Sequence, residues 1–105
     1  MGIRNLMVLA ASLVVAGNAL AKDGEALAST SNCMMCHDVA KKSTGPAFRD
    51  VAAKYRDDKN ALVKLEKKIR SGGAGTWGNM PMPPTARAVT DEDIKHIVQW
   101  ILALK

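Results

Sequence analysis

The sequence predicts an all-α fold in which about four short helices wrap around one covalently bound cofactor. Three observations predict it. Apolar residues recur at helical spacing in separate segments after residue 22. No segment alternates apolar and polar residues as a strand would, or repeats as a coiled coil would. A short motif that contains both cysteines of the chain lies between the first two helical segments.

That motif is Cys33-Met34-Met35-Cys36-His37, the attachment signature of a c-type haem. Two thiols at this spacing can add to the two vinyl groups of a haem, and the next residue then places an imidazole beneath the iron. A redox-active pair, a zinc site and a plain disulfide are the alternatives. The first needs a βαβ pattern and the second needs four ligands, and the sequence offers neither clearly. We therefore predict one covalently attached haem c, with its iron.

The first two predicted helices lie on either side of the motif. The first covers residues 23–32, with Ala26 and Leu27 as candidate inward residues. A loop rich in turn residues follows the motif at 41–46. Pro46 then starts the second helix, because its fixed φ suits a first turn. The apolar stripe of this helix is Phe48, Val51, Ala52 and Tyr55.

The last two predicted helices are separated by a long loop. Asn60 is expected to cap a helix over residues 61–70, which Gly72 ends. Thr90 and Asp93 form an approximate capping box for the last helix. The predicted buried stripes are Leu62, Leu65 and Ile69 in the third helix, and Ile94, Ile97, Val98, Ile101 and Leu102, with Trp100 alongside, in the last.

Residues 1–21 have the pattern of a cleaved Sec signal peptide. Arg4 supplies a positive charge, residues 6–15 are almost entirely apolar, and Ala19-Leu20-Ala21 is a small-residue cleavage site. The apolar run is too short to span a bilayer. We therefore expect export to the bacterial periplasm, with residues 22–105 as a single domain.

Composition restricts the class of partner. The 105-residue chain has a formal net charge of +5, with both signs interspersed, and contains two Trp, one Tyr and one Phe. This is not the profile of a nucleic-acid-binding protein. A weakly positive face for acidic redox partners and a merely solvated surface are equal alternatives. A domain this small usually needs a stabilising element besides its hydrophobic core, and a buried haem would supply one.

Residues 71–89 form a long segment rich in Gly and Pro, which we expect to wrap over a ligand because it also carries Trp77, Met80 and Met82. The second axial ligand decides between carrier and enzyme, since Met/His ligation is typical of electron-transfer cytochromes. Local physics prefers neither methionine strongly. The remaining candidates are poorly placed: Met34 and Met35 in the attachment motif, and His96, expected to be solvated on the last helix.

From residue 23 onward the chain resembles the small bacterial class I cytochromes c of the cytochrome c-551/c-552 group, which implies the class I cytochrome c fold. The most specific match is a Met enclosed by prolines at this distance from the cysteines. The matching segments are the attachment motif, Gly45-Pro46-Ala47-Phe48-Arg49-Asp50-Val51-Ala52-Ala53-Lys54-Tyr55, Trp77-Gly78, Pro81-Met82-Pro83-Pro84 and Trp100-Ile101-Leu102.

The resemblance implies a role for each matching residue. Cys33 and Cys36 correspond to the cysteines that form the thioethers. His37 corresponds to the proximal iron ligand. Met82 corresponds to the distal ligand, because it is the methionine inside Pro-Met-Pro-Pro.

Two further residues are implied to support the haem, and one departs from the group. The carbonyl of Pro46 corresponds to the acceptor for the second ring N–H of His37, a bond that fixes the tautomer. Trp77 corresponds to a Trp whose indole N–H reaches a haem propionate. Thr85 stands where the group often has an Asn that reaches the ligand sulfur, and two alternatives are open: the Thr85 hydroxyl replaces that contact, or the contact is absent.

The resemblance implies a soluble, monomeric single-electron carrier of a respiratory chain, without stable membrane insertion and without enzyme activity. Similar proteins carry electrons from membrane respiratory complexes to terminal reductases or oxidases, and the sequence does not choose among these partners. A haem enzyme is the alternative, and it needs a vacant distal site with acid/base groups nearby. A relay subunit of a larger complex is another.

Overall fold

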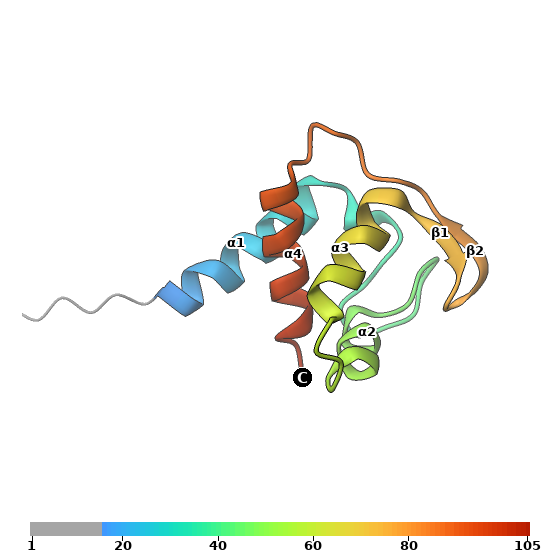
Figure 1. The fold of residues 1–105 in the computed structure, drawn as a ribbon, viewed down its shortest axis with the longest axis horizontal. Coiled ribbons are helices and arrows are strands. Elements are labelled where there is room, and N and C mark those ends of the chain that lie inside the picture. Colours follow the sequence, from blue (N-terminus) through green and yellow to red (C-terminus); the bar gives the residue numbers. More distant parts are fainter. Residues whose placement is uncertain (1–15) are drawn as a thin grey trace, which may run out of the picture.

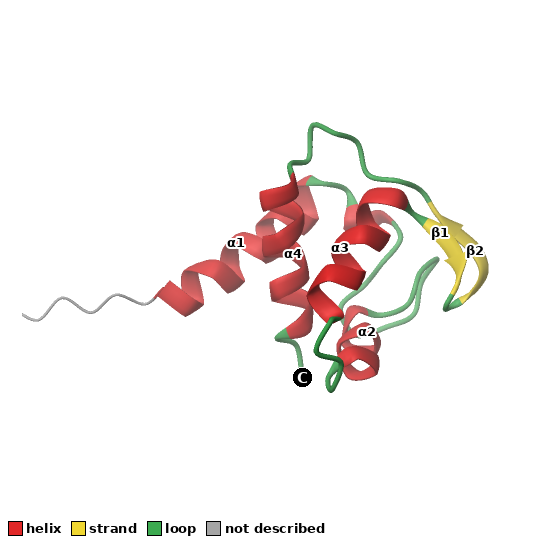
Figure 2. Cartoon of the chain, viewed as in Figure 1, coloured by secondary structure: helices red, strands yellow, loops and turns green. Residues whose placement is uncertain are grey.

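The computed structural model of the protein describes residues 16–105, with side chains described from residue 23. Helices pack around a shared core, and a small hairpin lies at the end of the molecule away from the first helix (Figures 1 and 2). The all-α prediction is confirmed. Within the described residues, no helix combines the length and apolar content needed to cross a membrane. The elements are α1 (Ala16–Thr30), the 3₁₀ turn η1 (Cys33–Met35), α2 (Phe48–Tyr55), α3 (Ala61–Ser71), β1 (Gly73–Gly75), β2 (Gly78–Met82) and α4 (Asp91–Leu102).

The last helix, α4, is the centre of the packing, because α1, α2 and α3 all contact it. It begins with the predicted capping box: the Asp93 N–H donates to Thr90 Oγ1 at 3.1 Å, and the Thr90 N–H donates to Asp93 Oδ2 at 3.4 Å. Its predicted inner face is confirmed, with Leu102 only partly buried at the edge. The buried residues of α4 are Ile94, Ile97, Val98, Trp100 and Ile101.

Helix α1 approaches α4 more closely than its sequence suggests. Its buried positions are Gly24 and Ala28, whereas Ala26, which we predicted to face inward, is exposed. A Cβ at Gly24 would collide with the carbonyl oxygen of His96 and with Cβ of Trp100. The small residues of α1 therefore face α4, and the prediction for Ala26 is wrong because that face was chosen by hydrophobicity rather than by size.

The predicted signal peptide lies largely outside the described residues, which begin at residue 16. Residues 16–21 belong to α1, which starts before the predicted helix at 23–32 and passes through the expected cleavage site.

Helices α2 and α3 follow the predicted pattern closely. Phe48, Val51 and Ala52 are buried in α2, and Leu65 and Ile69 in α3. Ala47 rather than Pro46 precedes α2 as its N-cap residue, in an extended conformation, so the helix starts slightly later than predicted.

The start of α3 differs from the prediction. Asn60 occupies the N-cap position, but its side chain makes no capping hydrogen bond. Instead, Asp58 Oδ1 accepts the Asn60 N–H at 2.8 Å, and Asp58 Oδ2 accepts from Lys64 Nζ at 2.7 Å. The carboxylate two residues earlier therefore organises this turn. Gly72 ends α3 as predicted, at φ 69°.

A two-stranded hairpin within residues 71–89 contradicts the prediction that the chain has no strands. β1 and β2 are antiparallel, with Gly73 opposite Met82 and Gly75 opposite Gly78, and the register is irregular between these pairs (Figure 2). Glycine supplies three of these four positions, at φ values of 115–121°. The hairpin consequently lacks the alternation of apolar side chains from which strands are recognised.

His96 is less solvated than expected. Its side chain is only 22% exposed, its Nε2 lies 3.4 Å from Glu92 Oε1, and its Nδ1 is buried with no hydrogen-bond partner among the described residues. The expectation is wrong because α1 packs on α4 at this point, where Gly24 contacts the His96 backbone.

Candidate functional site

A sharp turn after α1 presents the Cys-Met-Met-Cys-His motif. Asn32 adopts a left-handed conformation at φ 66°, which Asn tolerates better than most residues. The chain then forms the short turn η1, in which the carbonyl of Cys33 accepts the N–H groups of Cys36 at 3.2 Å and His37 at 3.0 Å. The motif is thus folded by its own backbone. Local sequence reasoning did not foresee this 3₁₀ turn.

Both thiols are free and half-buried. Burial raises the pKa of the Cys33 thiol above 9.0, only partly offset by a backbone hydrogen bond. At neutral pH Cys33 is therefore a neutral thiol. Between the two cysteines, Met34 and Met35 are exposed.

The imidazole of His37 is held by one of its two nitrogens. Nδ1 lies 2.7 Å from the carbonyl oxygen of Pro46. Because a carbonyl can only accept, Nδ1 carries the proton in this contact, and Nε2 then has the lone pair that binds a metal. The contact expected from the sequence resemblance is thus present in the structure.

The loop that carries Pro46 is folded back onto the motif. The Gly45 N–H donates to the Cys36 carbonyl at 2.7 Å. A Cβ at Gly45 would lie 2.6 Å from Cε1 of His37, so a side chain there would displace the ring. Glycine at position 45 is therefore needed for the His37 ring to take this position.

An aromatic column connects this imidazole to the core. The rings of His37 and Phe48 are stacked, and Phe48 meets Trp100 edge-on at 5.5 Å between centroids. Phe48 belongs to α2 and Trp100 to α4. The orientation of His37 is consequently tied to the packing of two helices.

The structure separates the two candidate methionines. Met82 is partly buried and packs against the hydrophobic core, where it pairs with Gly73 at the base of the hairpin. Met80 is 65% exposed. Both residues belong to β2, but of the two only the Met82 side chain is held by the hydrophobic core.

Trp77 lies at the turn between β1 and β2 and is 45% exposed, so it is not an ordinary core Trp. The ammonium of Lys54 lies 5.8 Å from the centre of its indole ring, within the range of a cation–π contact. This contact links the hairpin to α2 and brings a positive charge close to the indole.

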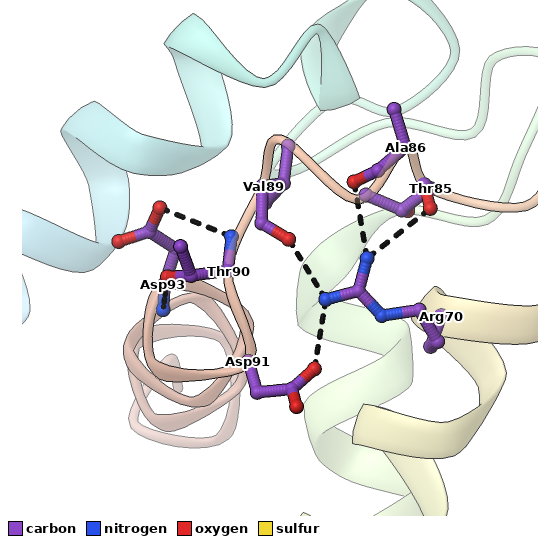
Figure 3. A network of polar contacts seen from close by, with 7 residues as sticks. All are labelled: Arg70, Thr85, Ala86, Val89, Thr90, Asp91 and Asp93. Atoms are coloured by element: carbon purple, nitrogen blue, oxygen red, sulfur yellow. Dashed lines mark hydrogen bonds and ion pairs between the residues drawn. The ribbon is translucent and has the colours of Figure 1, made fainter.

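The strap from Pro83 to Thr90 follows Met82 and leads into α4. Arg70, in the last turn of α3, donates hydrogen bonds to several of its carbonyls (Figure 3). Sequence reasoning missed Arg70. Its partners are 15 to 21 residues away, and nothing distinguishes one Arg from the other basic residues of this helix.

A family model described as Cytochrome c matches residues 21–105, almost the whole described part of the chain. The chain belongs to the cytochrome c family. Cytochrome c-552 of Hydrogenobacter thermophilus is 49% identical over 81 residues, which cover 77% of this chain and 81% of that protein. Cytochrome c-552 of Nitrosomonas europaea is 48% identical over 96 residues, covering 91% of this chain and 90% of that protein.

The fold agrees with the family. The crystal structure of the Nitrosomonas europaea cytochrome c552 superposes with a TM-score of 0.74 at 47% identity, over 77% of this chain and 99% of that chain. The protein is thus a class I cytochrome c of the c-551/c-552 group, and its cofactor is one covalently bound haem c. Cytochromes of this group are electron carriers.

The residues around the motif fit this haem. Two free thiols stand at the attachment spacing, and an imidazole is held so that Nε2 has a free lone pair. The imidazole can take this position only because residue 45 is Gly, since the ring fills the place of a Cβ there. A thioether with a position fixed by the fold is available at Met82, on a separate segment.

Proposed function

We propose that this cytochrome c is a periplasmic single-electron carrier in a bacterial respiratory chain. Cys33 and Cys36 would hold the haem through thioether bonds, and His37 Nε2 and Met82 would ligate its iron. When bound, the haem supplies the one-electron couple. The observation that carries the proposal is that nitrogen and sulfur donors stand on two segments, each anchored to the fold.

The anchoring matters because electron transfer is fastest when little rearranges. Pro46 and Phe48 hold His37 in one orientation. Met82 is held by core packing and strand pairing. Two protein donors on the iron would leave no open position for a substrate, which favours a carrier over an enzyme.

Trp77 and its neighbour Lys54 are proposed to face a haem propionate. An indole N–H donates a hydrogen bond, and an ammonium adds a favourable charge. Lys54 lies over the indole ring rather than at its edge, which leaves the indole N–H free to donate.

Export and partners complete the proposal. Residues 1–21 act as a signal peptide, and the mature protein works in the periplasm. Its partners are a membrane respiratory complex as donor and a terminal reductase or oxidase as acceptor, docked briefly by weak electrostatic steering. Mass spectrometry of the exported protein should show one haem and a chain that starts at Lys22.

The ligand assignment is tested by the oxidised visible spectrum of the matured protein, which should contain the weak far-red methionine–iron band. Met82→Ala should abolish the band and Met80→Ala should retain it. Loss of the band only in the Met80 variant would reverse the assignment. Rapid binding of carbon monoxide by the reduced parent protein would favour a gas-binding or peroxidase function instead.

A further inference from the structure

We infer that Arg70 is a positioning residue for the methionine ligand, because it holds the strap of residues 83–90 and so controls how readily Met82 leaves the iron. The inference rests on the proposed ligation by Met82. It adds a residue that lies outside the attachment motif, outside the hairpin and outside the strap itself.

The contacts of Arg70 span most of the strap (Figure 3). Nη1 donates to the carbonyls of Thr85 at 3.2 Å and Ala86 at 3.0 Å. Nη2 donates to the Val89 carbonyl at 2.7 Å and to Asp91 Oδ1 at 2.8 Å. In return, the Arg70 carbonyl accepts the Thr85 N–H at 3.3 Å. One side chain thus joins the end of α3 to the strap and to the first turn of α4.

The strap needs such a partner. Residues 83–89 have no regular secondary structure, so apart from the Ala86 carbonyl, which accepts the Val89 N–H, their carbonyls lack the regular backbone partners of a helix or a sheet. Pro83 and Pro84 at its start have no N–H to donate. A planar guanidinium presents several donors in a fixed fork, which suits acceptors on different sides, whereas a Lys ammonium is a point charge.

The bonds to carbonyls matter more than the ion pair. The Arg70 side chain is only 19% exposed, while that of Asp91 is 89% exposed. An ion pair to so exposed a carboxylate is screened and contributes little. The charged hydrogen bonds to carbonyls are more sheltered, and charged hydrogen bonds are the stronger kind.

The backbone is restrained both before and after Met82. On its N-terminal side, β2 pairs with β1. On its C-terminal side, the Met82 carbonyl and the backbone of Pro83 and Pro84 lie against Gly72 with no room for a Cβ. Beyond the two prolines, Arg70 holds Thr85 twice, because its side chain donates to the Thr85 carbonyl and its carbonyl accepts the Thr85 N–H. Removing the Arg70 side chain keeps the backbone bond to Thr85 but deletes the bonds to the carbonyls of Thr85, Ala86 and Val89, so the strap is held less firmly and the thioether can leave without global unfolding.

The test uses matured, haem-loaded protein and follows departure of the ligand. Excess imidazole binds ferric iron only after the methionine has left, so its binding rate at saturation measures that departure. Arg70→Ala should raise this rate at least about tenfold, which corresponds to about 1.4 kcal/mol. It should also lose the far-red band at lower temperature or denaturant than it loses helical circular dichroism. Arg70→Lys should restore little of either property.

Two controls separate the network from charge and from general stability. Asp91→Asn removes the ion pair and leaves the carbonyl bonds, so its rate should stay within about twofold of the parent rate. Lys64 lies on α3 like Arg70, but it pairs with Asp58 and not with the strap. Lys64→Ala breaks that ion pair and should leave the imidazole-binding rate unchanged.

The outcomes are distinguishable. Equal imidazole rates in the parent and both Arg70 variants, with the band lost only on global unfolding, would overturn the inference while leaving the ligation intact. If Arg70→Ala does not fold, the imidazole-binding rate of Arg70→Lys is the test: a raised rate supports the inference, and a rate equal to that of the parent overturns it. A parent without the far-red band, or a Met82→Ala variant that keeps it, would overturn the proposed ligation and with it the inference.

Discussion

His37 and Phe48 lie face to face, with ring centroids 4.7 Å apart and 19° between their planes. The stacking and the bond to Pro46 restrain different motions of the same imidazole. Phe48 prevents the ring from tilting, and the Pro46 carbonyl prevents it from rotating about its own axis. Both residues come from the segment that enters α2. The segment Gly45-Pro46-Ala47-Phe48 therefore supplies the contacts that orient the His37 ring.

Gly45→Ala should disturb the orientation of the His37 ring without straining the backbone. The added methyl would lie 2.6 Å from Cε1 and 2.9 Å from Nδ1 of His37, so the ring must move and its bond to Pro46 must lengthen. We expect a loss of about 1–3 kcal/mol in the free energy of unfolding. Paramagnetic NMR of the oxidised protein should show shifted His37 ring resonances.

Gly75→Ala is the matched control for that experiment. Gly75 has φ 118°, but beyond its chain neighbours no atom of the described residues lies within 4 Å of the place that an added methyl would take, so this change strains the backbone alone. It should lower stability modestly and leave the His37 resonances in place. Unshifted resonances in Gly45→Ala would mean that the close approach does not restrain the ring.

Gly24→Ala tests the contact between α1 and α4. The new Cβ has no space against the His96 carbonyl and the Trp100 side chain, so the helices must separate. Overpacking of this kind should cost about 1–3 kcal/mol in denaturant-induced unfolding, despite the better helix propensity of Ala. Ala26→Ser, on the exposed side of α1, should stay within about 0.5 kcal/mol of the parent. A stable Gly24→Ala variant would refute the close contact.

The carboxylate of Asp38 gives stability a predictable pH dependence. It accepts the N–H groups of Ala40 and Lys41, both at 2.9 Å, and these bonds hold the pKa of Asp38 below its ordinary value of 3.8. A lowered pKa in the folded state stabilises the protein above 3.8, and this contribution is lost as the pH falls through the lower folded value.

Asp38→Asn should therefore lower the Tm at pH 7, and the difference from the parent should shrink as the pH falls below 3.8. Thermal unfolding at several pH values measures it. The effect is small because the carboxylate is exposed. A difference that grows on acidification would have the wrong sign for this mechanism.

Removal of the haem should unfold most of the chain. The core is small, and large apolar side chains remain on the surface of the described residues, among them Trp77 and Met80. A domain of this size seldom supplies enough buried area alone. The variant with both Cys33 and Cys36 replaced by Ala, purified without haem, should show little helical circular dichroism. A native-like spectrum from that variant would contradict this expectation.

The features predicted from sequence are those with local causes. Thr90 and Asp93 cap α4 through residues three apart, and Gly72 ends α3 by its own conformation. The features that were missed depend on tertiary contacts. Gly24 is informative only once α4 lies beside it, and Arg70 only once the strap passes over it. The glycine-rich hairpin lacked any side-chain pattern to recognise.

The site shows the same division. The attachment motif was readable because its chemistry depends on spacing alone. Met80 and Met82, only two positions apart, could not be separated by local physics. Core packing separates them, because Met82 lies against it and Met80 is exposed.

The central position of α4 has a consequence for biosynthesis. α1, α2 and α3 all bury their apolar faces against a helix that is translated last. A nascent chain therefore cannot close its interior until its C-terminal segment has emerged. Until then, both sulfhydryls belong to a polypeptide whose helices have not yet packed together.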